Sequence, residues 1–165
     1  MHGALSATEM EERLNNPELK DTFHKELLAY LSAIVYEEHP HEPIGRQPAN
    51  DTMHHTSSKR PLNPSDPDFE SKFPDDLASV ISKCNMHKHT KTCYKYGHDS
   101  CRFDFQRPAV EIAEIKDGVI FLRRRTGHGW VNNYNDIFSA ALRCNNDIKF
   151  ISNGSDSKAL SYYIT

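Results

Sequence analysis

No apolar run in this chain approaches the roughly 18 residues that a transmembrane helix needs, so we expect no membrane-spanning segment. The N-terminal stretch MHGALSATEMEERL also lacks the basic flank and apolar core of a secretory signal peptide. Without secretion thiols stay reduced, and the four cysteines then suit metal binding better than disulfides. The GxxxxGKS/T loop that cradles nucleotide phosphates is missing too, because residues 154–158 read GSDSK, and we expect no ATP site.

Large apolar residues are scarce, with 37% hydrophobic and 26% charged residues in a chain of 165. We expect one domain of which part is not packed. Seven prolines fall between positions 37 and 74, a composition typical of an extended or disordered connector. We interpret His39 and His41 in this part as incidental rather than metal-binding. The expected division is a helical segment over 1–36, a flexible Pro-rich linker over 37–73 and an α+β segment over 74–165.

The net charge of −3 is unevenly distributed along the chain. Residues 1–76 hold 7 Lys/Arg against 15 Asp/Glu, a balance of −8, whereas residues 77–125 hold 10 against 5, a balance of +5. A basic segment suits nucleic-acid phosphate, although a solvated charged surface explains the same pattern. The candidate DNA-contacting residues are Lys95, Arg102, Arg107, Arg123, Arg124 and Arg125.

Cysteine and histidine are concentrated in residues 84–108, which hold three of the four cysteines and three of the ten histidines. Zinc prefers four convergent thiolate and imidazole ligands, and spacings of two to four residues let neighbouring side chains bind one ion. We expect a structural Zn²⁺ ion here. The preferred ligand set is His87, His89, Cys93 and Cys101, with Cys84 as the substitute for one histidine. The alternative interpretation is a basic surface loop with free thiols.

Local patterns predict helices before this segment. Ser6 and Glu9 form a capping box that predicts a helix to about Leu14, and Asn16-Pro17 predicts a second helix running to about Tyr36. Pro74 is expected to open a third, short helix. The packing face of the second helix follows from apolar residues at three- and four-residue steps: Leu19, Phe23, Leu27, Tyr30, Leu31, Ile34 and Val35.

After residue 108, the strongest local signal is a β-hairpin over residues 110–123. Alternating apolar residues flank Asp117-Gly118 there, and this dipeptide is favoured in type I′ turns. Asn135 is expected to cap a helix that ends at Asn145-Asn146. Residues 147–151 predict a strand, and a final helix is expected from about residue 155, cut short at the end of the chain. The expected fold class is therefore α+β.

Several stretches resemble the helicase-like region of Helitron transposon proteins, most closely the fungal kind. They are His87-x-His89-x3-Cys93-Tyr-Lys-Tyr, Cys101-Arg-Phe-x-Phe-x-Arg-Pro108, Ala141-Leu-Arg-Cys-Asn-x-Asp-Ile-Lys-Phe150 and Ala159-Leu-x-Tyr-Tyr-Ile-Thr165. The N-terminal HGALS and the helices after it fit the same family, so the resemblance covers nearly the whole chain. Such proteins join a replication-initiator nuclease of the HUH class to a helicase, and they cut and join single-stranded DNA in rolling-circle transposition.

The resemblance implies single-stranded DNA as a partner and a tyrosine that attacks a DNA phosphodiester in the whole protein. Tyr163 matches the first tyrosine of the family's tyrosine helix, and Tyr162 is the alternative nucleophile. The second tyrosine, the metal-binding histidine pair and the helicase motor are missing. His87 and His89 do not replace that pair, because the nuclease needs an apolar residue where Lys88 stands.

We therefore expect a catalytically incomplete fragment of a Helitron-type protein, either a decayed transposon copy or a truncated gene model. The family implies a nuclear location, and the cytoplasm is the other possibility. A different class of function is a stand-alone zinc-binding, nucleic-acid-binding module without chemistry. A third interpretation is an inert remnant that binds nothing.

Overall fold

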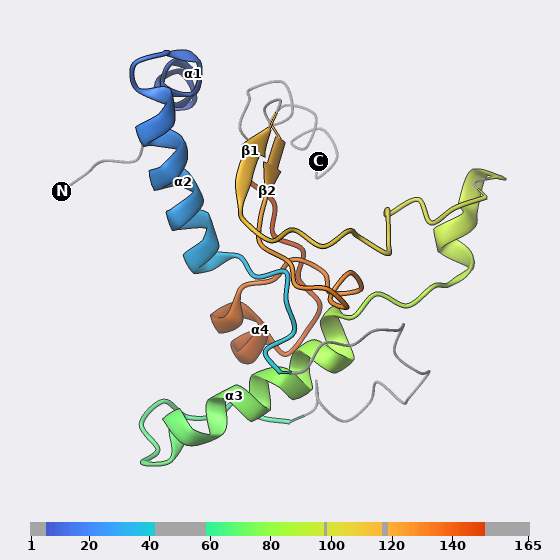
Figure 1. The fold of residues 1–165 in the computed structure, drawn as a ribbon. Helices are drawn as coiled ribbons and strands as arrows, with labels where there is room; N and C mark the ends of the chain where they lie inside the picture. The colour runs from blue at the N-terminus through green and yellow to red at the C-terminus, as the bar shows by residue number, and fades with distance from the viewer. Residues whose placement is uncertain (1–5, 42–58, 98, 117–118, 151–165) are drawn as a thin grey trace.

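The computed structural model describes residues 6–41, 59–97, 99–116 and 119–150 (Figure 1). Within these ranges it combines helices with one two-stranded antiparallel sheet, which confirms an α+β fold at a coarse level. None of the helices described is long and apolar enough to cross a membrane. The α-helices and strands are α1 (Ala7–Asn15), α2 (Lys20–Ile34), α3 (Phe69–Val80), β1 (Glu114–Lys116), β2 (Val119–Phe121) and α4 (Asp136–Leu142).

The predicted capping box at α1 is confirmed. The Ser6 hydroxyl accepts from the backbone N–H of Glu9 at 3.3 Å, and the Glu9 carboxylate accepts from the Ser6 N–H at 2.8 Å. The predicted start of α2 at Asn16 is wrong, because the helix begins at Lys20. Asn16 instead forms a turn: its side chain accepts from the Glu18 N–H at 2.9 Å, and its carbonyl accepts from the Lys20 N–H at 2.8 Å.

Helix α2 packs its apolar face against the β-hairpin. The first core cluster consists of Phe23, Leu27, Leu31, Val35 and Leu122, with Ile115 and Ile120 of the strands packed against it. Two residues predicted for this face lie on its edge instead. Leu19 and Tyr30 are 50% and 62% exposed, so the buried face is narrower than the sequence spacing indicates.

The first residues of the predicted linker hydrogen-bond with distant parts of the chain, whereas positions 42–58 lie outside the described residues. Tyr36 pairs with Tyr134 through two backbone hydrogen bonds of 2.8 and 2.9 Å. Beyond it, the Glu38 carbonyl accepts from the Tyr134 hydroxyl, and the His39 N–H donates to His128. The predicted start of α3 at Pro74 is also wrong, because the helix begins at Phe69 and Pro74 lies inside it. Proline has no backbone N–H and so removes one helical hydrogen bond, yet the helix continues on both sides of Pro74. The rings of Phe69 and Phe73 contact each other in the turn before it, with centroids 5.3 Å apart.

Helix α3 leads directly into the segment rich in cysteine and histidine. A single π-helical turn, η2 (Ile81–Asn85), continues it, and Met86 then pairs with Val131. A 3-10 helix, η3 (Lys91–Gly97), follows, and Figure 1 shows this part of the chain extending away from the helices. The second core cluster holds its base in place: Leu77, Ile81, Met86, Val131 and Tyr134.

The predicted β-hairpin is confirmed over its described strands. β1 pairs with β2 so that Ile115 faces Ile120 and Lys116 faces Val119. A further bridge between Val110 and Arg124 extends the pairing. The Asp117-Gly118 turn lies outside the described residues.

The Asn135 cap of α4 is confirmed, because its side chain accepts from the Phe138 N–H at 3.0 Å. The helix ends earlier than predicted, at Leu142, where Arg143 adopts a left-handed conformation with φ 53°. The predicted strand over 147–151 is wrong for residues 147–150, which form no strand. Their apolar side chains Ile148 and Phe150 pack against the first core cluster instead. The predicted final helix, with Tyr162 and Tyr163, lies outside the described residues.

Candidate metal centre

Two histidines enter the candidate site from the extended stretch after η2. The His87 N–H donates to the Trp130 carbonyl at 2.7 Å, which holds this stretch against the loop before α4. His87 and His89 are two residues apart, and their rings contact each other edge-on with centroids 5.2 Å apart. Between them stands Lys88, where the nuclease motif needs an apolar residue. A lysine at this position is compatible with two ligands on a surface segment.

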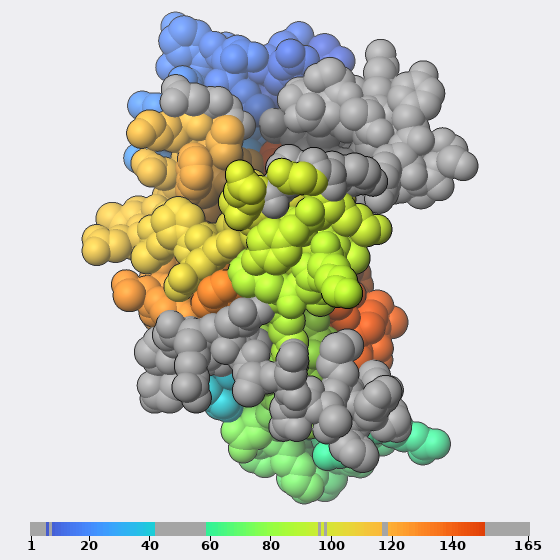
Figure 2. Space-filling model, turned by 90° about the vertical axis from the view of Figure 1, so that its right-hand side faces the viewer, coloured from blue at the N-terminus to red at the C-terminus, as the bar shows by residue number. Residues whose placement is uncertain are grey.

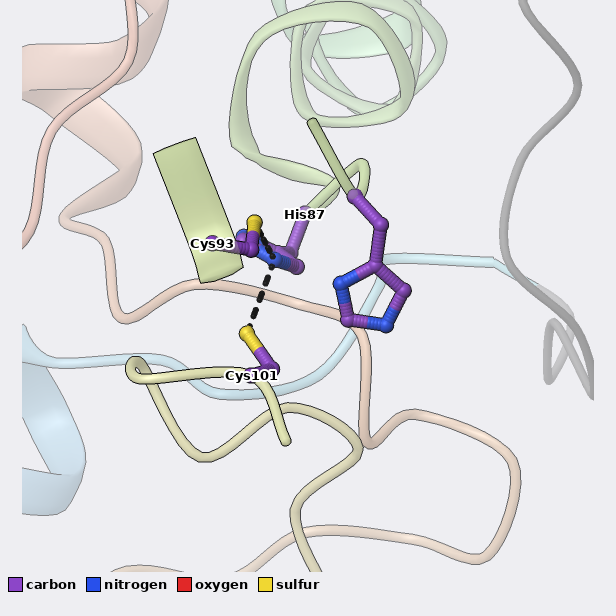
Figure 3. A group of neighbouring side chains, drawn as sticks. His87, Cys93 and Cys101 are labelled. Carbon is purple, nitrogen blue, oxygen red and sulfur yellow. Dashed lines mark hydrogen bonds between the residues drawn. The ribbon is translucent and has the colours of Figure 1, made fainter. Parts of the chain in front are cut away.

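Two cysteines complete the site from the residues that follow. Cys93 lies within η3, and the chain then returns so that the Arg102 N–H donates to the Cys93 carbonyl at 3.1 Å. This bond places Cys101 beside Cys93, and Figure 3 shows both thiols next to the His87 ring. In Figure 2 the segments 84–97 and 99–110 lie side by side on one face of the molecule.

The four donor atoms lie within 4.8 Å of one another. His87 Nε2 is 3.5 Å from Cys93 Sγ and 3.4 Å from Cys101 Sγ. Tetrahedral zinc with ordinary Zn–N and Zn–S bond lengths separates nitrogen and sulfur by roughly 3.6 Å, so both distances fit a shared ion. One proton on Nε2 can satisfy only one of the two sulfurs at a time, whereas a metal ion satisfies both.

The environment favours the ligand forms of these side chains. Cys93 and Cys101 are buried, and the Thr90 N–H donates to Cys93 Sγ at 3.4 Å, an interaction that stabilises a thiolate. Burial, together with the neighbouring His89 and Arg107 side chains, lowers the pKa of His87 to about 4. His87 is therefore neutral at pH 7. His89 Nδ1 is buried and has no hydrogen-bond partner among the described residues, so its lone pair is available.

Aromatic rings enclose both histidines. The Phe105 ring is stacked on His87, with centroids 4.0 Å apart, and the Arg107 guanidinium lies over Phe105 at 4.6 Å. Trp130 contacts His89 edge-on at 5.2 Å. These contacts restrict the imidazole orientations, and the sequence analysis did not identify them. No strand-type alternation in FDFQR could have indicated them, because Asp104 adopts a left-handed conformation with φ 55° and residues 103–107 form no strand.

The structure distinguishes among the five candidate ligands. It brings together the preferred set of two histidines and two cysteines, and it leaves Cys84 outside. The Cys84 thiol donates to the Arg143 carbonyl at 3.5 Å, and burial raises its pKa. Cys84 therefore lies as a protonated thiol between η2 and the end of α4.

The six candidate DNA-contacting residues fall into two groups. Lys95, Arg102 and Arg123 are exposed, whereas Arg107 is half-buried and donates to Asn133. Arg125 donates to the Glu38 carboxylate at 2.7 Å.

Arg124 requires a correction to its proposed role in DNA contact. Its guanidinium and the Glu37 carboxylate form an ion pair in which both side chains are only 8% exposed. The guanidinium also donates to the Pro108 carbonyl at 2.8 Å. Arg124 is thus used inside the protein and is not presented to a phosphate.

Comparisons with known proteins identify no relative of this chain. No protein-family model, no curated protein and no solved structure matches the chain. The site is therefore interpreted from the chemistry of its own residues.

Proposed function

We propose that His87, His89, Cys93 and Cys101 bind one structural zinc ion, and that the zinc-bound segment presents a basic, aromatic surface to single-stranded DNA. The observation that carries the proposal is the convergence of two imidazoles and two thiols within 4.8 Å. Four protein ligands fill a tetrahedral zinc shell and leave no position for water or substrate. The site is therefore structural, and it can supply folding free energy on the order of 10 kcal/mol by analogy with zinc-finger peptides.

Support for DNA as the partner comes from the exposed side chains around the metal cluster. Tyr94 and Phe103 are 44% and 43% exposed, and the Arg102 guanidinium lies 4.5 Å over the Phe103 ring. Exposed aromatic rings with adjacent cations are the elements on which single-stranded bases stack. Lys95 adds a further exposed positive charge, and the surrounding residues 77–125 carry a balance of +5.

The resemblance to Helitron proteins gives this module a biological setting. We propose that it belongs to a protein of rolling-circle transposition, where it would hold single-stranded DNA in the nucleus while other parts cut it. The Tyr163 nucleophile remains part of that proposal, with Tyr162 as the alternative. A stand-alone zinc-dependent DNA-binding module is the second candidate, because the described residues supply a metal cluster and a binding surface without requiring any chemistry.

Zinc content and DNA affinity of the purified chain test the proposal. We expect one zinc per chain by elemental analysis, with loss of metal in Cys93→Ser and Cys101→Ser. Cys84→Ser and Cys144→Ser are matched controls that should keep full occupancy, because neither thiol belongs to the cluster. Binding of a fluorescent single-stranded oligonucleotide should weaken as salt rises. Full zinc occupancy in both ligand variants would refute the ligand set, and salt-independent or absent DNA binding would refute the partner.

A further inference from the structure

We propose that the cavity beside His87 binds one unstacked nucleotide of single-stranded DNA, and that Asn85 selects bases that carry an exocyclic amino group. This inference rests on the proposed function for the identity of its ligand. The cavity has a volume of about 260 Å³ and is lined by residues of η2, the histidine stretch and the two loops that flank α4. Pockets for drug-sized ligands begin near ~300 Å³, so this cavity suits a group of nucleobase size.

Asn85 is the residue that gives the cavity its selectivity. It lines the cavity, yet the residue is only 1% exposed. Its side-chain NH₂ donates to the Asn146 carbonyl at 2.9 Å. A carbonyl can only accept, so this bond fixes the orientation of the amide and assigns the opposite atom as Oδ1.

The Oδ1 atom of Asn85 is buried and has no hydrogen-bond partner in the part of the chain described. A buried acceptor without a partner is costly, and a ligand that brings a donor removes that cost. The exocyclic amino groups of adenine and cytosine are such donors. Asn85 therefore favours these bases over analogues that lack the amine.

Two lysines make the cavity favourable for a negatively charged ligand. Lys83 and Lys88 both line it, and neither forms an ion pair with any described acidic residue. A phosphate attached to the bound base supplies the missing negative charge. The polar wall is completed by Asn132, whose NH₂ is divided between the Asn145 side chain and the Asn146 carbonyl, both at a long 3.4 Å. Such weak bonds are easily exchanged for bonds to a base.

The cavity and the metal cluster share one residue. His87 lines the cavity while its Nε2 atom faces the two cysteine sulfurs. The Asn132 N–H also donates to the Asn85 carbonyl at 2.8 Å, which fixes the cavity wall to the loop before α4. Zinc bound by His87 would therefore hold the nucleotide pocket next to the aromatic surface proposed to stack the neighbouring bases.

The test compares nucleotides that differ only in the amino group, so it needs no folding-sensitive variant. The zinc-loaded full chain is titrated with dAMP and with purine deoxyriboside monophosphate, then with dCMP and its des-amino analogue, and binding is followed by NMR. At least one natural nucleotide should bind roughly tenfold more tightly than its des-amino partner, with shifts at the Asn85 side-chain amide. Equal affinity within both pairs, as expected if a water molecule occupies the Asn85 acceptor, would overturn the proposal.

Charge at the cavity is tested separately. The double variant K83Q/K88Q should lose most of the affinity for dAMP but little of that for deoxyadenosine, which has no phosphate. Lys116→Gln on β1 is the matched control, since this exposed lysine does not line the cavity. Zinc content and oligonucleotide affinity are measured on the same samples. If the chain binds zinc and oligonucleotide but shows no amino-group preference, the pocket proposal is refuted and the proposed function stands. If the chain contains no zinc but still prefers nucleotides with the amino group, the pocket proposal stands and the zinc proposal is refuted.

Discussion

The imidazole of His87 lies flat on the ring of Phe105, with centroids 4.0 Å apart and planes inclined by only 4°. The Arg107 guanidinium lies over the same Phe105 ring, 4.6 Å from its centroid. A ring held in this way has few orientations open to it, so the Nε2 atom stays directed at the cysteine sulfurs. Phe105 would thereby position His87 for the zinc ion that we propose.

Replacing Phe105 with leucine should weaken zinc binding by about tenfold, because loss of residues that orient a metal ligand typically costs ten- to a hundredfold in affinity. Competition with a coloured chelator measures this change. Phe138→Leu is the matched control: that ring is 56% exposed on α4 and is not among the rings that contact His87 or His89, so it should leave zinc affinity unchanged. Equal zinc affinity in wild type and Phe105→Leu would show that the stack does not position His87.

Removal of zinc should destabilise residues 84–108 and leave the first core cluster folded. Met86 is the one described residue over 84–108 that belongs to a core cluster, so we expect the amide protons of the rest of this segment to exchange rapidly after chelation. The first core cluster around Phe23, Leu27 and Leu31 contacts none of the metal ligands and should stay protected. Hydrogen exchange with and without chelator measures both regions. Loss of protection in α2 together with the zinc segment would mean that the two parts fold as one unit.

Local signals predicted the parts of the fold that depend on neighbouring residues. The capping box at Ser6, the hairpin and the Asn135 cap each need only a few adjacent side chains, and each is confirmed. The convergence of two histidines and two cysteines that could hold a metal ion was predictable for the same reason, since the four residues lie within 15 consecutive positions. The N-terminal extension of α3 was missed because a proline typically marks the first turn of a helix, whereas α3 continues through Pro74.

Contacts between distant segments were not predictable in this way. Arg124 was expected at the surface beside two other arginines, yet its partner Glu37 lies 87 residues away. His39, interpreted as incidental, donates its backbone N–H to His128 across 89 residues. A local sequence pattern does not indicate which two charged residues will form a buried pair. Glu37 follows α2 and Arg124 follows β2, so their pairing depends on how these elements pack.

Truncation of Glu37 tests the buried ion pair. Burial outweighs the attraction of Arg124 and raises the pKa of Glu37, while burial lowers that of Arg124, so each partner depends on the other for its charge. Glu37→Ala leaves the guanidinium buried without a counter-charge and should cost about 3–5 kcal/mol of unfolding free energy. Urea denaturation measures it. Glu38→Ala removes a more exposed pair with Arg125 and the acceptor of the Arg125 N–H, and should cost about 1–2 kcal/mol. Equal costs for the two variants would contradict the distinction.

The buried histidines His39 and His128 should make the protein less stable below pH 6.5. The His39 N–H donates to His128 Nδ1 at 2.8 Å, so His128 accepts that bond only when neutral. Burial lowers the pKa of both histidines below the ordinary 6.5. Above pH 6.5 neither folded nor unfolded chain binds the extra protons. Below it the unfolded chain binds more, so stability falls by up to ~1.4 kcal/mol per pH unit for each histidine until its folded pKa is reached.

Thermal unfolding at pH 7.5, 6.5 and 5.5 measures the effect, and variants separate the histidines concerned from the others. His128→Asn keeps an acceptor near the position of Nδ1 but cannot titrate, so it should flatten the decline between pH 6.5 and 5.5. His24→Gln on α2 is the control, because His24 is not among the groups that influence the pKa of His39 or of His128. It should keep the wild-type slope, and the contribution of His87 is the same in all three proteins and cancels. An unchanged slope in His128→Asn would show that protonation of this buried pair does not limit stability in acid.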